Sequence, residues 1–315
     1  MASTASLAQE SAEGTPEPTP TPGSETPAGT PPTLESAREA VRATTVWLAR
    51  GVDSWFGDRP FFEAGGRVSD GLLSIGLFQR EGDRLDVNVR LRARLSLPNL
   101  GDSGFAFLGR DDPREVIADT PGAVARYERL GRDTRNDREF LAGIGVALRE
   151  VFDFRLGLRG GLKPYLQARY HEEWEPADGV HLIEFRQTFF LTKEDQLGST
   201  TALSVAHAWT PQLTTRALTA ATITQRERRY EVSSVLGVYR SFEQRRLLSL
   251  ELPFVAVQGT GVTIDDVGLL LKWEQPFLRE WLVGEFVVGS FWPRPEPSVQ
   301  RTHVWAAGLG VRLSF

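Results

Sequence analysis

The chain has 315 residues, of which 41% are hydrophobic and 24% are charged, with a net charge of −5 at pH 7 and no cysteine. The negative charge argues against a general nucleic-acid binder, and the lack of cysteine excludes a disulfide scaffold and a thiolate metal site. No apolar run reaches the length of about eighteen residues that a membrane-spanning helix needs, since Lys272 and Glu285 interrupt the longest candidates. A transmembrane β-barrel is compatible with this composition, because only every second residue of its strands is apolar.

Residues 1–33 have a composition from which no core can form. Ser6-Leu7-Ala8 is typical of the end of a signal peptide, so these first residues are either a signal-peptide remnant or an arbitrary polar terminus. From Ser11 to Thr33 the sequence consists of small and polar residues around seven prolines, which predicts a disordered linker.

Residues 34–58 are predicted to form a short amphipathic helix. Apolar residues recur there at helical spacing, with arginines between them. The apolar set is Leu34, Ala37, Val41, Leu48, Val52 and Trp55. Such a helix could lie on a membrane surface or cover the strand that follows it. A third interpretation is that residues 9–58 together dock a periplasmic partner.

Between residues 66 and 315 the period of the apolar residues changes to two, which is typical of strands with one apolar face. In the clearest case, Leu85 to Leu97, leucines and valines alternate with Arg90, Arg92 and Arg94. Similar segments follow at nearly even spacing with short polar turns between them, which predicts an antiparallel β-meander. They are residues 152–159, 165–170, 183–192, 200–209, 213–225, 230–239, 247–257, 262–273 and 281–292.

The segment Thr302–Phe315 closes the series with the same alternation, and Trp305, Leu313 and Phe315 lie on its apolar face. It resembles the closing strand of bacterial outer-membrane β-barrels. The resemblance implies location in the outer membrane, contact with its lipid, and recognition of this strand by the barrel-assembly machinery. Tryptophans at the ends of other strands fit the aromatic girdles of such barrels. These are Trp209, Trp273, Trp281 and Trp292.

We therefore predict an all-β fold, an up-and-down antiparallel transmembrane β-barrel of twelve to fourteen strands over residues 66–315. The competing fold is a soluble β-sandwich, which needs Greek-key connections and leaves sheet edges exposed. If both termini are periplasmic, fourteen strands place the polar stretch 111–137 outside the cell, whereas twelve place residues 98–137 in the periplasm. Fourteen is favoured because periplasmic turns are short.

The alternation also predicts which charged side chains face the lumen. Most of the cations lie in the first half of the barrel and most of the acids in the second. The predicted lumen residues are Arg90, Arg92, Arg94, Arg155, Arg159, Lys163, Arg169, Arg186, Glu184, Glu231, Glu251, Asp266 and Glu285. Because a closed sheet brings these two walls face to face, they either pair across the lumen or leave a transverse field.

The favoured function is a narrow channel for small hydrophilic or anionic solutes. Arg90, Arg92 and Arg94 form its predicted selective element, since a row of fixed cations concentrates anions. The alternative is a structural or partner-docking barrel whose charges only fill the lumen. An outer-membrane enzyme is the less favoured class, because Ser204 and His207 lie three residues apart on opposite faces of one strand and cannot form a dyad. We predict no catalytic residue, metal or cofactor.

Overall fold

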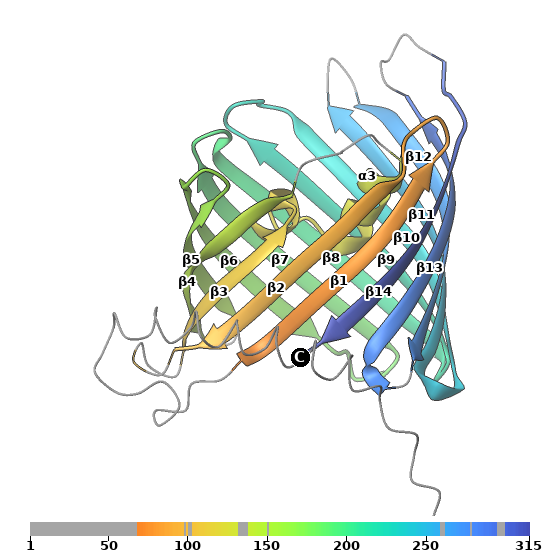
Figure 1. The fold of residues 1–315 in the computed structure, drawn as a ribbon, viewed down its shortest axis with the longest axis horizontal. Coiled ribbons are helices and arrows are strands. Elements are labelled where there is room, and N and C mark those ends of the chain that lie inside the picture. The colour runs from red at the N-terminus through yellow and green to blue at the C-terminus, as the bar shows by residue number, and fades with distance from the viewer. Residues whose placement is uncertain are drawn as a thin grey trace, which may run out of the picture.

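The computed structural model describes residues 68–97, 99, 103–131, 138–149, 151–258, 262–277, 279–294 and 300–315. Over these residues the chain forms a closed barrel of 14 antiparallel strands (Figure 1). Each strand pairs with the next in sequence and β1 pairs with β14, so the predicted up-and-down barrel is confirmed. The predicted linker 1–33 and helix 34–58, which include the partner segment 9–58, lie outside the described residues.

The strands have between 8 and 16 residues. The first seven are β1 (Val68–Arg80), β2 (Asp86–Ser96), β3 (Gly104–Asp111), β4 (Glu139–Leu148), β5 (Phe152–Arg159), β6 (Lys163–Trp174) and β7 (His181–Thr192). The others are β8 (Gln196–Thr210), β9 (Leu213–Thr224), β10 (Tyr230–Phe242), β11 (Arg246–Gln258), β12 (Val262–Phe277), β13 (Arg279–Pro293) and β14 (Val304–Ser314). A 3-10 turn, η2 (Glu243–Arg245), joins β10 to β11. We call the end where β1 begins and β14 ends the proximal end, and the opposite one the distal end.

The outer face of the wall is apolar, because alternate side chains of each strand point away from the lumen. On β2, Val87 is 57% exposed, whereas its neighbour Asn88 points inward and is 2% exposed. Leu309 and Val311 on β14 are exposed in the same way. An apolar exterior around a polar interior is the arrangement of transmembrane barrels. No helix in the described part of the chain is long and apolar enough to cross a membrane.

The closing strand pairs with the first strand in a continuous register. Leu72 pairs with Ser314, and Arg80 pairs with Ala306 at the distal end of the ladder. Beyond the last pair, the backbone N–H of Phe315 donates to the carbonyl of Gly71 over 3.0 Å. A side chain at position 71 would collide with the Phe315 ring, because an added Cβ would lie 2.5 Å from it. The terminal residue therefore completes the seam between the two ends of the barrel.

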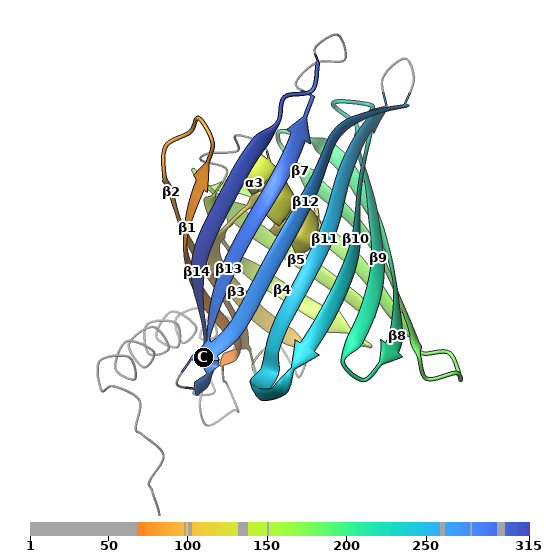
Figure 2. The same cartoon turned by 90° about the vertical axis from the view of Figure 1, so that its right-hand side faces the viewer.

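The connection between β3 and β4 enters the lumen instead of lying outside it. It carries α2 (Pro113–Val116) and α3 (Gly122–Gly131), and both helices lie within the ring of strands (Figure 2). We call residues 112–131 the inner segment. The prediction of fourteen strands places this stretch outside the cell. The strand count is correct, but the external position is wrong for residues 112–131.

Two apolar patches on the inner wall explain why the inner segment folds inward. Tyr127 and Leu130 of α3 pack against a cluster that the last strands provide, namely Val255, Leu270, Val287, Phe291 and Ala306. Ile117 packs against Leu141, Tyr165 and Phe190 on the other side of the barrel. Burial of these side chains removes apolar surface from the water of the lumen, which favours the inward position.

Candidate functional site: the charged lumen

Arginines of β2 hold the first part of the inner segment. Arg90 and Asp111 form an ion pair with an Nη2–Oδ1 distance of 2.8 Å, and Arg92 donates to Glu115 on α2 over 2.6 Å. Arg90 also contacts Glu115, and Arg92 also contacts Asp111. The side chain of Asp111 is only 1% exposed. The four charges therefore form one closed network between the wall and α2.

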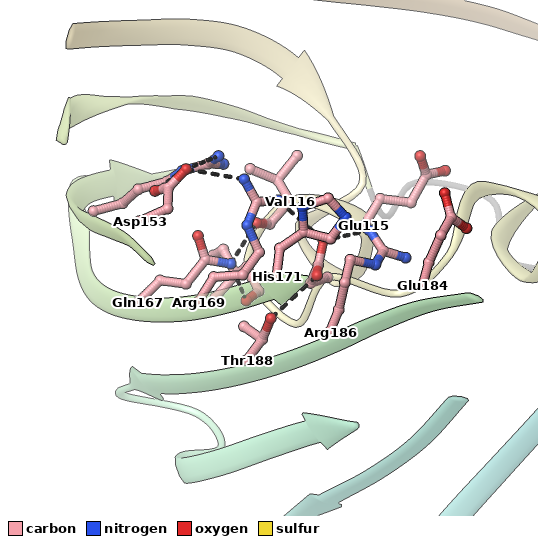
Figure 3. A network of polar contacts seen from close by, with 12 residues as sticks. Glu115, Val116, Asp153, Gln167, Arg169, His171, Glu184, Arg186 and Thr188 are labelled. Atoms are coloured by element: carbon pink, nitrogen blue, oxygen red, sulfur yellow. Dashed lines mark hydrogen bonds and ion pairs between the residues drawn. The ribbon is translucent and has the colours of Figure 1, made fainter. Parts of the chain in front are cut away.

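A second network holds the turn between α2 and α3 (Figure 3). Asp119 accepts hydrogen bonds from Arg169, Arg186 and Thr188 over 3.4, 3.3 and 3.1 Å. Asp119 has φ of 58°, in the left-handed region that Asp enters more readily than most residues with a side chain. Gln167 adds two hydrogen bonds, from its amide nitrogen to the carbonyl groups of Val116 and Ile117, over 2.9 and 2.7 Å.

The opposite side of the inner segment is basic and meets the acidic wall. Arg126 on α3 donates to Glu251 on β11 over 3.3 Å, and Arg114 lies 3.5 Å from Glu231 on β10. Glu251 is 3% exposed and also accepts from the Tyr239 hydroxyl over 3.2 Å. The inner segment thus presents acids to the arginines of β2, and arginines to the acids of β10 and β11.

This arrangement differs from direct pairing of the two walls across the lumen, which was one of the predicted outcomes. In the described residues, Arg90 and Arg92 find their carboxylates on β3 and α2. Glu231 and Glu251 form ion pairs with arginines of the inner segment. The physical reason is distance: a segment inside the barrel reaches both walls, and oppositely charged groups gain most when they are close.

The remaining predicted lumen residues form local pairs along the wall. Arg155 and Arg169 share the carboxylate of Asp153, each over 2.9 Å. Arg159 and Lys163 both pair with Glu194 in the distal turn between β7 and β8.

Three predicted acids lie elsewhere on the inner wall. Glu184 pairs with Arg216. Asp266 accepts from the backbone N–H of Arg294 over 3.0 Å. Glu285 lines a cavity of about 210 Å³ together with Arg126 and Arg312.

Arg94 differs from its two neighbours on β2. Its guanidinium carbon lies 3.6 Å from the centre of the Phe105 ring, and no carboxylate of the described residues forms an ion pair with it. It borders a cavity of about 380 Å³ beside α2, which we call the arginine chamber. The arginines that line this chamber are Arg92, Arg94, Arg155, Arg169 and Arg186. Its acidic lining consists of Asp70, Asp111, Glu115 and Asp119.

Two of the histidines lie outside this lumen network. His207 and His181 lie on the outer face near the proximal end, with 3.0 Å between Nδ1 of His207 and Nε2 of His181. Asp178 contacts His181 over 2.6 Å. Ser204 points inward and accepts from Arg216, so Ser204 and His207 lie on opposite faces as predicted. Among the described residues, no group of three or more His, Asp or Glu side chains is arranged to hold a metal ion.

Comparison with known proteins identifies similar barrels but no family. Neither a family model nor a curated protein matches the sequence. OmpT of Vibrio cholerae is 12% identical, with 79% of this chain and 98% of that chain covered and a TM-score of 0.47. An anion-selective porin from Comamonas acidovorans is 10% identical, with 79% and 100% covered and a TM-score of 0.47. A KdgM porin is 10% identical, with 78% and 99% covered and a TM-score of 0.37.

The chain is an outer-membrane β-barrel. Its own features carry this conclusion, namely the closed antiparallel wall, the apolar outer face and the charged lumen. The class and the outer-membrane location predicted from the sequence are therefore confirmed.

The inner segment contributes four lumen residues that were not predicted from the sequence, namely Arg114, Glu115, Asp119 and Arg126. One signal for them exists. Val124, Tyr127 and Leu130 recur every three residues in an otherwise polar stretch, which is typical of a helix with one apolar face.

Proposed function

We propose that the protein is a narrow channel for small hydrophilic anions, with the inner segment as its constriction. The observation that carries the proposal is the arginine chamber, a space of about 380 Å³ inside the lumen with five arginines in its wall. Arg94 provides a guanidinium group that forms no ion pair within the described residues, although Asp70 lies opposite it on β1. A fixed cation without a partner in a confined space raises the local concentration of anions.

The proposal divides the predicted row of three arginines into two roles. Arg90 and Arg92 are neutralised by Asp111 and Glu115, so they position the inner segment. Arg94 is the selective residue of the row. The inner segment leaves room for small solutes only, because α2 and α3 occupy part of the lumen.

Conductance in planar bilayers tests the proposal. With a salt gradient across the bilayer, the wild-type reversal potential should indicate anion preference, and Arg94→Ala should lower that preference. Arg110→Ala is the matched control, because Arg110 neighbours Asp111 on β3 but is exposed on the outer face. Its reversal potential should equal that of the wild type.

The triple variant Arg90→Ala, Arg92→Ala, Arg94→Ala separates the channel from the alternative of a charge-filled structural barrel. If the protein is a channel, the wild type conducts. The triple variant then conducts more, with less anion preference, because it loses both the ion pairs that hold the inner segment and the selective cation. If the wild type does not conduct and only the triple variant does, the lumen is a structural core and the channel proposal is wrong.

A further inference from the structure

We propose that the arginine chamber binds a small organic anion that carries a planar apolar ring, such as an aromatic monocarboxylate. The inference rests on the proposed channel function, which it deepens by naming the class of solute. Two features of the chamber carry it. One is a surplus of guanidinium groups, and the other is a pair of phenylalanine rings beside them.

The surplus of positive charge follows from how the chamber arginines share their partners. Arg155, Asp153, Arg169, Asp119 and Arg186 form one chain of ion pairs, in which three arginines share two carboxylates. Arg94 adds a fourth guanidinium group that forms no ion pair within the described residues, and Asp70, opposite it on β1, adds a third carboxylate. Four arginines therefore share three carboxylates. A carboxylate that enters the chamber therefore finds planar donors suited to two parallel hydrogen bonds.

The apolar half of the site comes from β3. Phe105 and Phe107 both point inward, with ring centres 6.3 Å apart and planes tilted by 49°. The Phe107 ring lies 6.4 Å from that of Tyr165 on β6. Both phenylalanines line the chamber, together with Val116 and Leu141. Tilted rings at these separations favour a further ring beside them, because the edge of one ring attracts the face of the next.

The two halves meet at Arg94 and Arg155. Arg94 stacks on Phe105, and the guanidinium carbon of Arg155 lies 5.7 Å from the centre of Phe105 and 5.8 Å from that of Phe107. A carboxylate bound by these two arginines would carry its ring next to Phe107. A chamber of about 380 Å³ is at the lower end of the range for small-molecule sites, so it suits a single-ring compound.

Equilibrium binding to the purified full-length barrel in detergent micelles tests the inference. Isothermal titration with benzoate should show binding, and acetate should bind about tenfold more weakly, because it lacks the ring. Benzyl alcohol should show no detectable binding, because it lacks the charge. Equal affinities for benzoate and acetate would overturn the inference.

Variants locate the site. Arg94→Ala should abolish benzoate binding, and Phe107→Leu, which keeps an apolar side chain, should weaken it about fivefold. Arg216→Ala is the matched control, since Arg216 also faces the lumen but pairs with Glu184 outside the chamber. This variant should bind benzoate with the affinity of the wild type. A mobility shift on heating in a denaturing gel verifies that each variant folds. If folded Arg94→Ala binds benzoate as the wild type does, the proposed site is wrong.

Binding in micelles does not require an open pore, so this experiment is independent of conductance. Benzoate binding without conductance would overturn the channel and leave the site in place. Anion-selective conductance without benzoate binding would overturn this inference alone.

Discussion

The guanidinium group of Arg126 on α3 lies 3.3 Å from the carboxylate of Glu251 on β11, although 125 residues separate them in the chain. This contact fixes α3 to the wall opposite β2. Arg126→Ala should lower the free energy of unfolding by about 1–3 kcal/mol, because it leaves a nearly buried carboxylate with a single hydrogen bond from Tyr239. Urea unfolding in detergent micelles measures the loss.

Glu231→Gln is the control for that experiment. Its partner Arg114 is half exposed and lies 3.5 Å away, so its loss should cost less than about 1 kcal/mol. Equal losses for the two variants would mean that burial of Glu251 does not determine the strength of this attachment.

The acids that neutralise Arg90 and Arg92 should control the charge preference of the lumen. In the double variant Asp111→Asn, Glu115→Gln, both side chains keep their size and lose their charge. Two guanidinium groups then lack a counter-charge, so the reversal potential should shift toward stronger anion preference. Asp86→Asn, which removes the partner of Arg138 at the distal rim, is the control and should shift it less. An unchanged potential in the double variant would show that the charges of these pairs do not act on the conducted ions.

The closing strand should govern assembly more than stability. Deletion of Phe315, or Leu313→Ser with Phe315→Ser, should reduce the amount of folded barrel in the outer membrane severalfold. Phe315 completes the seam with β1 through its hydrogen bond to Gly71, and the resemblance to other closing strands implies that it is also recognised. The heat-modifiable fraction in isolated membranes measures the effect, with Ser314→Ala as the control. Normal levels of the deletion variant would count against Phe315 as an assembly signal.

The distal turn between β7 and β8 should resist acid. Hydrogen bonds from Lys163 and Arg159 lower the pKa of Glu194 from 4.5 to about 2. Since the folded pKa lies below the unfolded one, the stabilisation is fully present above pH 4.5 and is lost as the pH falls toward 2.

The comparison of the wild type with Glu194→Gln tests this pH dependence. The difference in free energy of unfolding should be constant above pH 4.5 and shrink between pH 4.5 and about 2. Because a third of the Glu194 side chain is exposed, the difference should stay within about 1 kcal/mol. A difference that stays constant down to about pH 2 would show that the pKa of Glu194 is the same in the folded and unfolded states.

The wall of the barrel could be predicted from the sequence because lipid outside and water inside impose a period of two on each strand. That constraint acts locally, so Val87 and Asn88 on β2 show it without knowledge of any partner. The same period predicted separate strands at residues 152–159 and 165–170, where the structure has β5 and β6.

The position of the inner segment could not be predicted in this way. Its charges, such as Arg114 and Glu115, are equally compatible with a solvated external loop. What brings the segment inside is tertiary packing, where Tyr127 meets Phe291 with ring centres 5.6 Å apart. The helical spacing of Val124, Tyr127 and Leu130 predicts an apolar face but does not tell which surface covers it. The division of roles between Arg90 and Arg94 depends on the position of the inner segment, so it could not be predicted from the sequence either.

The attachment of the inner segment to two walls of the barrel constrains how the sequence of this protein evolves. A positive residue at position 251 would repel Arg126, whereas a simultaneous reversal of charge at both positions would restore the attraction. The same holds for Arg90 and Asp111. Related sequences should therefore show correlated substitutions within these pairs, while outward residues such as Leu309 exchange freely with other apolar types.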